Sequence, residues 1–332
     1  MRNLSYFVFV LLLGCSSSDN RILVKNLGEA QGSFYHIQYL LEDGINYKIQ
    51  IDSILLEVDS SLSIYKEYSL ISQLNKGANI KTDAMFNEVY HSAMQVYKET
   101  DGNFDCSIYP LVKAWGFYKD NHVDSLIIDS LKFRNILQFV GFDKISLIAD
   151  SLFLPKGMSL DFNSIAQGYT VDVIAQFLQS KGDSNYLVEV GGELLAKGKN
   201  ADGNIWRVGV DKPTDSIDSN ERFLFIIDLE NKALATSGNY RKFYEKDGVK
   251  YAHTINPFTA FPAQNRLLSV TVIHDNCMLA DAYATAFMVM GIRKSKQFAK
   301  LHPEIEVYLV YTSKDGSWKS FISPTMQKRI IN

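Results

Sequence analysis

The sequence predicts an α+β fold, a single domain in which a mostly antiparallel sheet packs against helices. Apolar residues recur at helical spacing in two early segments, whereas the second half holds one strand-like run after another, often without a helix between them. Strand-after-strand order favours antiparallel pairing. With 332 residues, 46% of them hydrophobic and 12% aromatic, the chain can bury a large core.

The expected elements follow in chain order. Residues 34–39 alternate between apolar and polar side chains, which is typical of a half-buried strand, and residues 47–62 and 83–100 form the two expected helices. The polar stretch 211–221 is interpreted as a loop inside the domain, because strand patterns resume on both sides of it. Further strands are expected at residues 186–190, 206–210, 223–229, 268–273 and 307–312.

The first residues predict export and a lipid anchor. Arg2 precedes an apolar run over residues 4–13, which is too short to span a bilayer as a mature helix and is typical of a secretory signal. The run ends in Leu12-Leu13-Gly14-Cys15, which resembles the lipobox of bacterial lipoproteins. In that motif the small Gly14 admits the signal peptidase, and the sulfur of Cys15 receives the diacylglycerol.

This motif divides the chain into three parts. We expect a lipoprotein signal peptide over residues 1–14, the lipidated cysteine with a short tether over residues 15–20, and one folded domain over residues 21–332. The folded domain would then be lipid-anchored to a bacterial membrane and face the periplasm. The alternative is an uncleaved N-terminal anchor with a chance cysteine.

The charge of the chain indicates which classes of partner to expect, and its cysteine content indicates whether disulfides are expected. The formal net charge is −3, and the scattered Lys and Arg residues form no basic stripe, so we expect no nucleic-acid partner. Cys106 and Cys277 remain after lipidation and could pair in an exported protein. We expect two unpaired, buried thiols, because a core of this size needs no disulfide.

The first chemical motif lies at residues 158–169, where a short apolar strand leads into a helix. Ser164 and Gln167 have capping-box spacing. The start of a helix offers unpaired N–H groups to a phosphate, and Asp161 just before it could hold a cation or a hydroxyl group. A helix cap without any ligand is the alternative interpretation.

The second motif is Ala280-Asp281-Ala282-Tyr283-Ala284-Thr285. Asp281 and Thr285 are four residues apart, so their oxygens share one face of a helix that is otherwise apolar. A carboxylate with a hydroxyl suits a hard cation such as Mg²⁺, which fills its other positions with water and substrate phosphate. The alternative is that Asp281 caps the helix and Thr285 bonds its own backbone.

The third motif combines His253, in Tyr251-Ala252-His253-Thr254-Ile255-Asn256-Pro257, with the earlier turn Ala235-Thr236-Ser237-Gly238. His253 could act as a general base, although a histidine beside a strand also has purely structural roles. The turn could bring backbone close to a phosphate, or it could be a plain turn.

Together the three motifs, in their order, resemble the ApbE family, the FAD:protein FMN transferases once described as thiamine-biosynthesis lipoproteins. The resemblance covers nearly the whole mature chain. It is carried by Gln31-Gly32-Ser33-Phe34-Tyr35, Leu62-Ser63-Ile64-Tyr65, Asp101-Gly102-Asn103-Phe104-Asp105, Pro110-Leu111-Val112, Trp115-Gly116-Phe117, Leu160-Asp161 to Gly168-Tyr169, Val190-Gly191-Gly192, Ala235-Thr236-Ser237-Gly238, His253 to Pro257, Ser269-Val270-Thr271-Val272-Ile273 and Ala280-Asp281.

The resemblance implies a T-fold-like domain that binds FAD in a cleft between sheet and helices. It implies side-chain ligation of Mg²⁺ by Asp281 and Thr285, with an oxygen of Ser164 completing the protein share, and catalysis by His253 and Asp281. FAD contacts are implied at Gln31, Tyr65, Asn103, Phe104, Asp105, Asp161, Gln167 and Ile255.

The implied reaction is Mg²⁺-dependent transfer of FMN from FAD to a Thr or Ser hydroxyl, with release of AMP. The implied acceptors are subunits of Rnf-type or sodium-pumping respiratory complexes. Some residues depart from the family pattern, which usually has methionine at Gln31, lysine or glutamate at Gln167, Asp and Gly at Asn256 and Ala260, and in some members a further carboxylate at Ala284. The alternatives are an FAD pyrophosphatase that yields FMN and AMP, a lipoprotein that binds FAD without turnover, and an interaction protein with a vestigial site.

Overall fold

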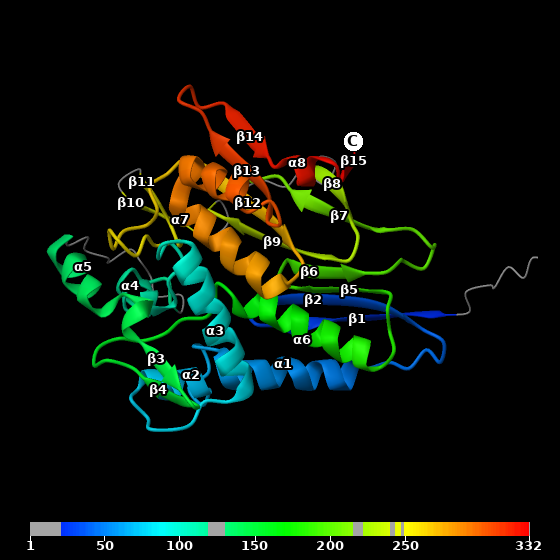
Figure 1. The fold of residues 1–332 in the computed structure, drawn as a ribbon, viewed down its shortest axis with the longest axis horizontal. Helices are drawn as coiled ribbons and strands as arrows, with labels where there is room; N and C mark the ends of the chain where they lie inside the picture. The colour runs from blue at the N-terminus through cyan, green and yellow to red at the C-terminus, as the bar shows by residue number, and fades with distance from the viewer. Residues whose placement is uncertain (1–20, 119–129, 215–221, 240–242, 247–248, 332) are drawn as a thin grey trace, which may run out of the picture.

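A computed structural model describes residues 21–118, 130–214, 222–239, 243–246 and 249–331. In these residues an eight-stranded sheet runs in the order β1-β2-β5-β6-β9-β12-β13-β14, and every neighbouring pair is antiparallel. The predicted α+β fold with a mostly antiparallel sheet is therefore confirmed (Figure 1). The predicted signal peptide, Cys15 and tether lie outside the described residues.

The strands agree closely with the sequence prediction. β5 and β8 have the expected bounds, and the strands predicted at residues 34–39, 206–210, 268–273 and 307–312 differ by a few residues at most. The short apolar strand predicted within residues 158–169 is wrong, because residues 158–162 extend without pairing into a sheet. The large sheet consists of β1 (Ile22–Ala30), β2 (Ser33–Leu41), β5 (Tyr186–Val190), β6 (Glu193–Lys197), β9 (Lys232–Gly238), β12 (Leu267–His274), β13 (Glu306–Thr312) and β14 (Trp318–Ile322). The smaller sheets are β7 (Trp206–Asp211) with β8 (Phe223–Leu229) and β15 (Ile330–Ile331), β3 (Ser146–Ile148) with β4 (Ser151–Phe153), and β10 (Phe243–Lys246) with β11 (Val249–Ala252).

Both predicted helices are present, and the second of them begins at a side-chain cap. Asp83 accepts a hydrogen bond from the N–H of Phe86 at 2.8 Å and so caps the second of them, α3. The described helices are α1 (Lys48–Leu62), α2 (Leu70–Asn75), α3 (Ala84–Glu99), α4 (Tyr109–Ala114), α5 (Ser130–Ile136), α6 (Ala166–Ser180), α7 (Cys277–Leu301) and α8 (Pro324–Gln327). None of them is long and apolar enough to cross a bilayer.

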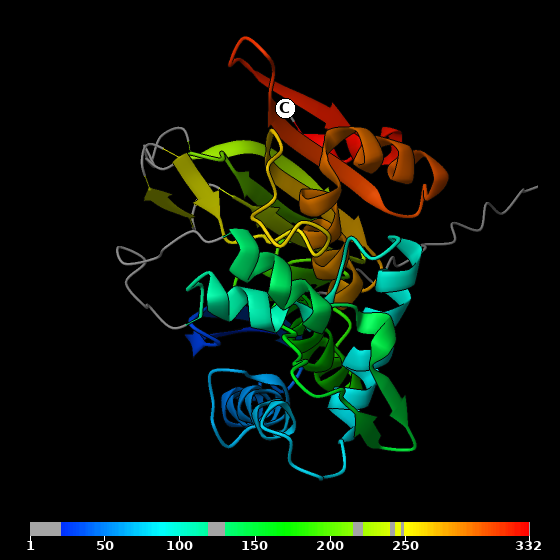
Figure 2. The ribbon, with the colours of Figure 1, turned by 90° about the vertical axis from the view of Figure 1, so that its left-hand side faces the viewer.

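The large sheet is covered differently on its two faces. Helices α6 and α7 pack on one face, with α1 and α3 outside them, and Figure 2 shows α1 nearly end-on below this layer. The small sheet that contains β7 and β8 covers the other face, where Leu187, Leu194, Trp206, Ile227 and Tyr308 share one buried cluster. This gives three layers of secondary structure around two apolar interfaces.

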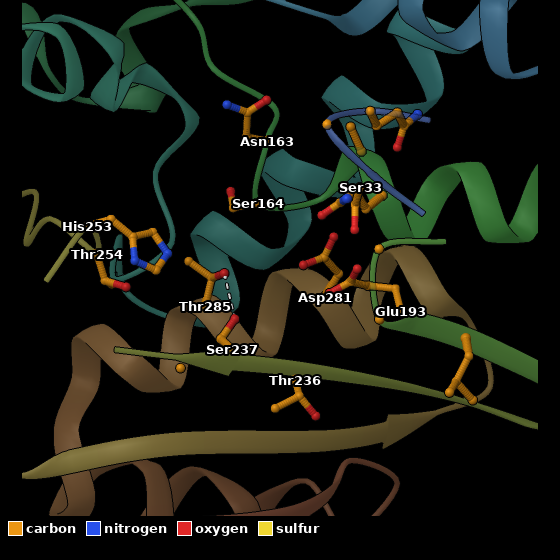
Figure 3. Close-up of a pocket in the computed structure, with 18 of the residues that line it drawn as sticks. Ser33, Asn163, Ser164, Glu193, Thr236, Ser237, His253, Thr254, Asp281 and Thr285 are labelled. Carbon is orange, nitrogen blue, oxygen red and sulfur yellow. Dashed lines mark hydrogen bonds between the residues drawn. The ribbon is translucent and has the colours of Figure 1, made fainter. Parts of the chain in front are cut away.

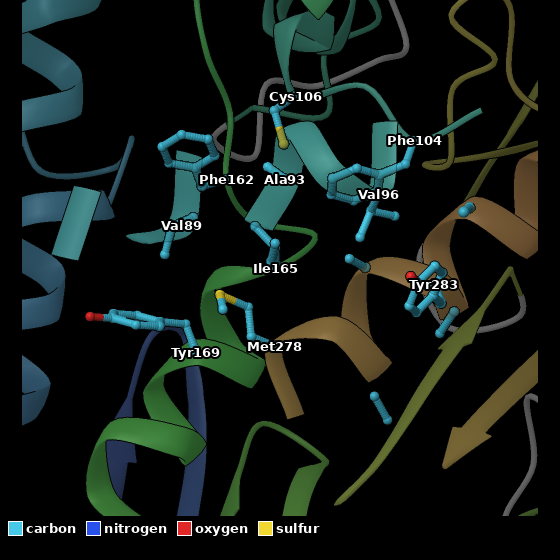
Figure 4. Close-up of a cluster of buried hydrophobic side chains, with 14 of the residues drawn as sticks. Val89, Ala93, Val96, Phe104, Cys106, Phe162, Ile165, Tyr169, Met278 and Tyr283 are labelled. Atoms are coloured by element: carbon cyan, nitrogen blue, oxygen red, sulfur yellow. The ribbon is translucent and has the colours of Figure 1, made fainter. Parts of the chain in front are cut away.

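The main core lies between the sheet, α3, α6 and α7. Figure 4 shows Val89 and Val96 of α3 facing Ile165 and Met278, at the starts of α6 and α7, across this interface. Gly168 lets the two helices approach closely, because a Cβ there would lie only 2.3 Å from the carbonyl oxygen of Cys277. Both Cys106 and Cys277 are buried and free, so the expectation of unpaired thiols is confirmed.

Helix α7 is held at its start and interrupted near its middle. The carboxylate of Asp172 in α6 accepts the N–H groups of Cys277 at 3.0 Å and Met278 at 2.8 Å. Gly291 has non-helical angles, with φ of 71° and ψ of 174°, and separates the helix into two halves. Asn265 donates to the carbonyl of Met288 at 2.6 Å, which satisfies an acceptor where the first half ends.

The predicted capping box at the start of α6 is wrong. The helix begins at Ala166, and the residue before it, Ile165, makes no side-chain cap. The chain instead makes a tight turn in which Phe162 accepts the N–H groups of Ile165 and Ala166, at 3.0 and 2.8 Å. This turn places Ser164 before the helix and Gln167 at its second residue, so their spacing no longer matches the two sides of a cap.

Candidate active site

A cleft of about 990 Å³ opens between the large sheet, the starts of α6 and α7, and the segments before α4. A cavity of this size holds a large organic ligand such as a dinucleotide. The structure brings all the predicted ligand and catalytic residues to its lining, namely Gln31, Tyr65, Asn103, Phe104, Asp105, Asp161, Ser164, Gln167, His253, Ile255, Asp281 and Thr285.

Asp281 is as deeply buried as Asp161 among these residues. Its side chain is 6% exposed, its Oδ2 accepts the N–H of Gly168 at 3.1 Å, and burial raises its pKa to about 7. Asn276 and Asp172 already cap α7, so the alternative that Asp281 is the helix cap is wrong. A buried carboxylate with a raised pKa is typical of a site that receives a positive charge from a ligand.

Thr285 lies one turn further along α7 and faces the sheet. Its Oγ1 is 3.2 Å from the Oγ of Ser237 in β9. Residues 235–238 all belong to this strand and pair with β12, so the turn predicted there is wrong. Figure 3 shows Asp281, Thr285 and Ser237 below Ser164, with their oxygens around one space. No group of three or more His, Cys, Asp or Glu side chains with metal-binding spacing occurs in the described part of the chain. The carboxylate of Asp281 with these hydroxyl oxygens fits a hard cation that keeps water and phosphate as its other ligands.

His253 lies on the opposite side of this space from Asp281. Figure 3 shows its imidazole pointing toward the space beside Thr285. Ile255, two residues further along the chain, is 6% exposed and packs in a cluster with Trp115, Phe133 and Ala260. The apolar cluster fixes the segment, while the histidine remains at the cleft surface.

Two further acids have pKa values raised by burial, but their hydrogen bonds differ. Asp161, whose pKa is raised to about 6, accepts the N–H of Asn163 at 2.8 Å through Oδ1. Asp105, also raised to about 6, accepts from the N–H of Ser107 at 2.7 Å and from the N–H of Phe142 at 3.3 Å, through different oxygens. The carboxylate of Asp105 therefore already holds two backbone segments together, and Asp161 keeps more acceptor capacity for a ligand.

The predicted aromatic surfaces differ in accessibility. Tyr65 is 46% exposed, stacks on Tyr118 with 5.6 Å between ring centroids, and accepts a hydrogen bond from Asn163 at 3.1 Å. Phe104 is 1% exposed and packs in the main core (Figure 4). Of these two implied FAD contacts Tyr65 is therefore the more accessible ring, because the ring of Phe104 completes the core beneath the cleft that it also lines.

Comparisons with known proteins identify the family to which this geometry belongs. A model of the "ApbE family" matches residues 31–309, which is most of the described chain. The chain belongs to the ApbE family. It is 34% identical to an FAD:protein FMN transferase of Vibrio cholerae over 95% of this chain and 96% of that protein. It is also 34% identical to an FAD:protein FMN transferase of Haemophilus influenzae, over 92% and 91% of the two chains.

Solved structures of ApbE proteins have the same fold. The flavin transferase ApbE from Vibrio cholerae superposes with a TM-score of 0.83 and 32% identity, over 93% of this chain and 99% of that one. The apo form of the Pseudomonas stutzeri flavinyl transferase ApbE gives a TM-score of 0.83 with 29% identity, over 93% and 97%. The resemblance of the sequence to the ApbE family is thus confirmed.

The two glutamines that depart from the ApbE pattern have structural roles in this chain. Gln31 has a positive φ of 52° in the β1–β2 turn and donates to the Oγ1 of Thr170 at 2.7 Å. Gln167 lies against the β5–β6 turn, where a Cβ on Gly191 would be only 2.1 Å from its Nε2. Gly191 also has φ of 71°, so both its conformation and its neighbour require a glycine.

One acidic residue of the ApbE cleft was missed from the sequence. Glu193 begins β6, is 7% exposed, lines the cleft, and lies next to Asp281 in Figure 3. The position of Glu193 could have indicated its role, since it directly follows Val190-Gly191-Gly192, one of the segments that carry the family resemblance. Ser237 was noticed only as part of a possible phosphate turn, and its partner Thr285 could not be inferred from a separation of 48 residues.

Proposed function

We propose that this chain is an FAD:protein FMN transferase, which moves the FMN half of FAD onto a Thr or Ser hydroxyl of an acceptor protein and releases AMP. The observation that carries the proposal is the meeting of Asp281, Thr285 and His253, from distant segments, around one space in a dinucleotide-sized cleft. The printed names of the relatives support the same activity.

A magnesium ion fits the oxygen donors of this space. Asp281 and Thr285 would hold the ion through side-chain oxygens, and Ser164, which lines the same cleft in the turn before α6, would add a third oxygen. When bound, Mg²⁺ neutralises charge on the diphosphate of FAD and on the departing AMP. The raised pKa of Asp281 fits this role, because a carboxylate that is costly to ionise alone gains most from a cation.

The protein groups around the diphosphate would then orient the reactants and accept the proton of the acceptor hydroxyl. His253 orients the acceptor hydroxyl and takes its proton as the oxygen attacks the FMN phosphorus. The bond between that phosphorus and the bridging oxygen breaks, and AMP leaves with the bridging oxygen. Asp161 and the exposed face of Tyr65 orient the two ends of FAD, and the surrounding core keeps the cleft rigid. A phosphodiester-linked FMN remains on the acceptor.

The cellular setting is also part of the proposal. The lipobox-like sequence ending at Cys15 supports a lipid anchor, with the folded domain on the periplasmic side of a bacterial membrane. Acceptors in such a place would be extracytoplasmic segments of membrane complexes, and the family resemblance suggests subunits of Rnf-type or sodium-pumping respiratory complexes. Mass spectrometry of the protein from membranes would show an acylated N-terminal Cys15, and an unmodified Met1 would refute the anchor.

The activity test uses the Cys15→Ser chain with FAD, Mg²⁺ and a candidate acceptor. Flavin fluorescence that stays on the denatured acceptor supports transfer, whereas free FMN with AMP indicates hydrolysis and unchanged FAD indicates binding alone. Asp281→Asn keeps the size of the side chain and should abolish turnover. Asp183→Asn is the matched control, because Asp183 is also buried, with a raised pKa of about 6, but is not part of the cleft lining.

A further inference from the structure

Exposed apolar side chains gather where the described chain begins. Ile22 at the start of β1 is 52% exposed, and Ile45 and Ile49 around the start of α1 are 47% and 82% exposed. The loop before α1 packs against β1, because a Cβ on Gly44 would lie 2.9 Å from the side chain of Ile22. Figure 1 shows the start of β1, this loop and the start of α1 on one side of the molecule. We call Ile22, Ile45 and Ile49 the anchor-side patch.

The distance from the predicted lipid to this patch is limited by covalent geometry. Five residues lie between Cys15 and Arg21, the first described residue, and the six extended Cα–Cα steps that join them span at most about 20 Å. Acyl chains on Cys15 lie in the bilayer, so the anchor-side patch would always be within about this distance of the lipid surface. This step rests on the lipid anchor that forms part of the proposed function.

The charges around the patch favour an apolar contact over an electrostatic one. Glu42 and Asp43 precede Ile45, and the ammonium group of Lys48 is 2.9 Å from Asp52. Lys48 also donates to the hydroxyl of Tyr35 at 2.6 Å, so its charge is already engaged. Residues 42–52 thus carry more acidic than basic groups, which would not attract anionic headgroups.

We propose that the anchor-side patch rests on the membrane interface and sets the orientation of the enzyme on the bilayer. Isoleucine side chains gain free energy when they leave water for the acyl boundary, and a short tether makes their local concentration there high. The occupant of the patch is therefore the lipid surface, and the contact does not depend on ionic strength.

This orientation places the active-site cleft away from the lipid. In the β1–β2 hairpin, Ile22 pairs with Leu41 at the patch end and Ala30 pairs with Ser33 at the other end. Nine residues at about 3.4 Å each separate the two ends by roughly 30 Å. Gln31 and Gly32, in the turn at the far end, line the cleft, as does Leu62 at the end of α1. The enzyme would therefore reach acceptor hydroxyls that project well above the membrane.

The test attaches the mature chain to vesicles independently of cellular lipidation. Cys106 and Cys277 are buried, so the thiol of Cys15 can be coupled selectively to maleimide lipids in vesicles of phosphatidylethanolamine and phosphatidylglycerol. A polarity-sensitive dye is attached through p-acetylphenylalanine at Ile49, and in a control chain at Leu131, which is 71% exposed in α5 at the other side of the molecule. Brominated phosphatidylcholine added to the vesicles serves as the quencher.

We expect blue-shifted, quenched emission from position 49, unchanged emission from position 131, and no effect of high salt. The double variant Ile22→Ser/Ile45→Ser should lower the quenching at position 49 several-fold without altering FAD turnover. Equal emission from both positions, or quenching that salt removes, would overturn the proposal. Flavin transfer to a soluble acceptor is measured on the same samples, so a failure of the proposed activity is seen separately from a failure of the orientation.

Discussion

Replacing Asp172 by alanine tests how α7 is positioned and, through it, how the candidate metal ligands are held. The variant leaves two buried N–H groups, those of Cys277 and Met278, without the acceptors that now lie at 3.0 and 2.8 Å. A buried donor that loses its partner costs about 1–3 kcal/mol, so we expect about 3 kcal/mol less stability for the pair. Burial raises the pKa of Asp172 to about 7, so at about pH 4, where the group is protonated in the folded chain and has only begun to ionise in the unfolded chain, its removal changes the pH-linked part of the stability little.

Urea unfolding of wild type and Asp172→Ala at that pH measures the difference. Asp281 lies one turn after the affected residues, so we also expect fraying of the first turn to reduce kcat at least about tenfold. Asp172→Asn is the control, because its amide oxygen keeps one acceptor and should retain about half of the stabilisation. A stability within about 0.5 kcal/mol of wild type for Asp172→Ala would refute the assignment of this carboxylate as the element that holds α7.

Four further outcomes are expected. Asp281→Asn should lose FMN transfer at least about 100-fold and lose any Mg²⁺-induced rise in Tm, and a variant that keeps the metal response would remove this ligand. His253→Ala should reduce the transfer rate by roughly 10² to 10⁴ while FAD affinity, measured by fluorescence, stays within a few-fold; a large loss of affinity instead would make the histidine a binding group. Gly191→Ala should weaken FAD binding or destabilise the fold by about 1–3 kcal/mol, because the new methyl group meets the side chain of Gln167 and the φ of residue 191 is positive. Unchanged stability and FAD binding by calorimetry would contradict the close approach of Gly191 and Gln167. The pKa of Asp172 is raised on folding to about 7, so the folded state loses stability progressively from about pH 4 to pH 7 as this group ionises in the unfolded chain. Denaturation across this range should show the stability of Asp172→Asn rising relative to that of wild type as pH rises. A constant difference in stability would contradict the burial of the charge.

Local patterns in the sequence were sufficient for most elements. The strands at residues 186–190 and 223–229 and the helix that ends at Leu62 could be predicted because alternation and helical spacing depend only on neighbouring residues. The start of α6 could not, since the turn in which Phe162 accepts the N–H groups of Ile165 and Ala166 moves the start of the helix past Ser164. Spacing alone cannot tell which of two local hydrogen-bond schemes the chain adopts.

In the candidate site too, residues close in sequence could be predicted together, whereas contacts between distant segments could not. Asp281 and Thr285 were recognisable because one helical turn separates them, and the other cleft residues were assigned through the family resemblance. The contact of Thr285 with Ser237, and the pairing of β2 with β5, join segments that are far apart in the chain, so no local pattern encodes them. The buried state of Phe104 likewise depends on the whole core and was missed for this reason.

The break in α7 at Gly291 divides the helix, and the half that carries Asp281 and Thr285 has its own hydrogen-bonded support at each end. Asp172 fixes its beginning and Asn265 satisfies its end, so the segment with Asp281 and Thr285 is secured at both extremities. Beyond the break, the hydroxyl of Ser295 donates to the carbonyl of Gly291 at 2.8 Å, and this hydrogen bond stabilises the start of the second half. Changes at the exposed positions after the break would therefore leave the segment with Asp281 and Thr285 in place, whereas Phe298 is constrained because its ring packs on Phe287.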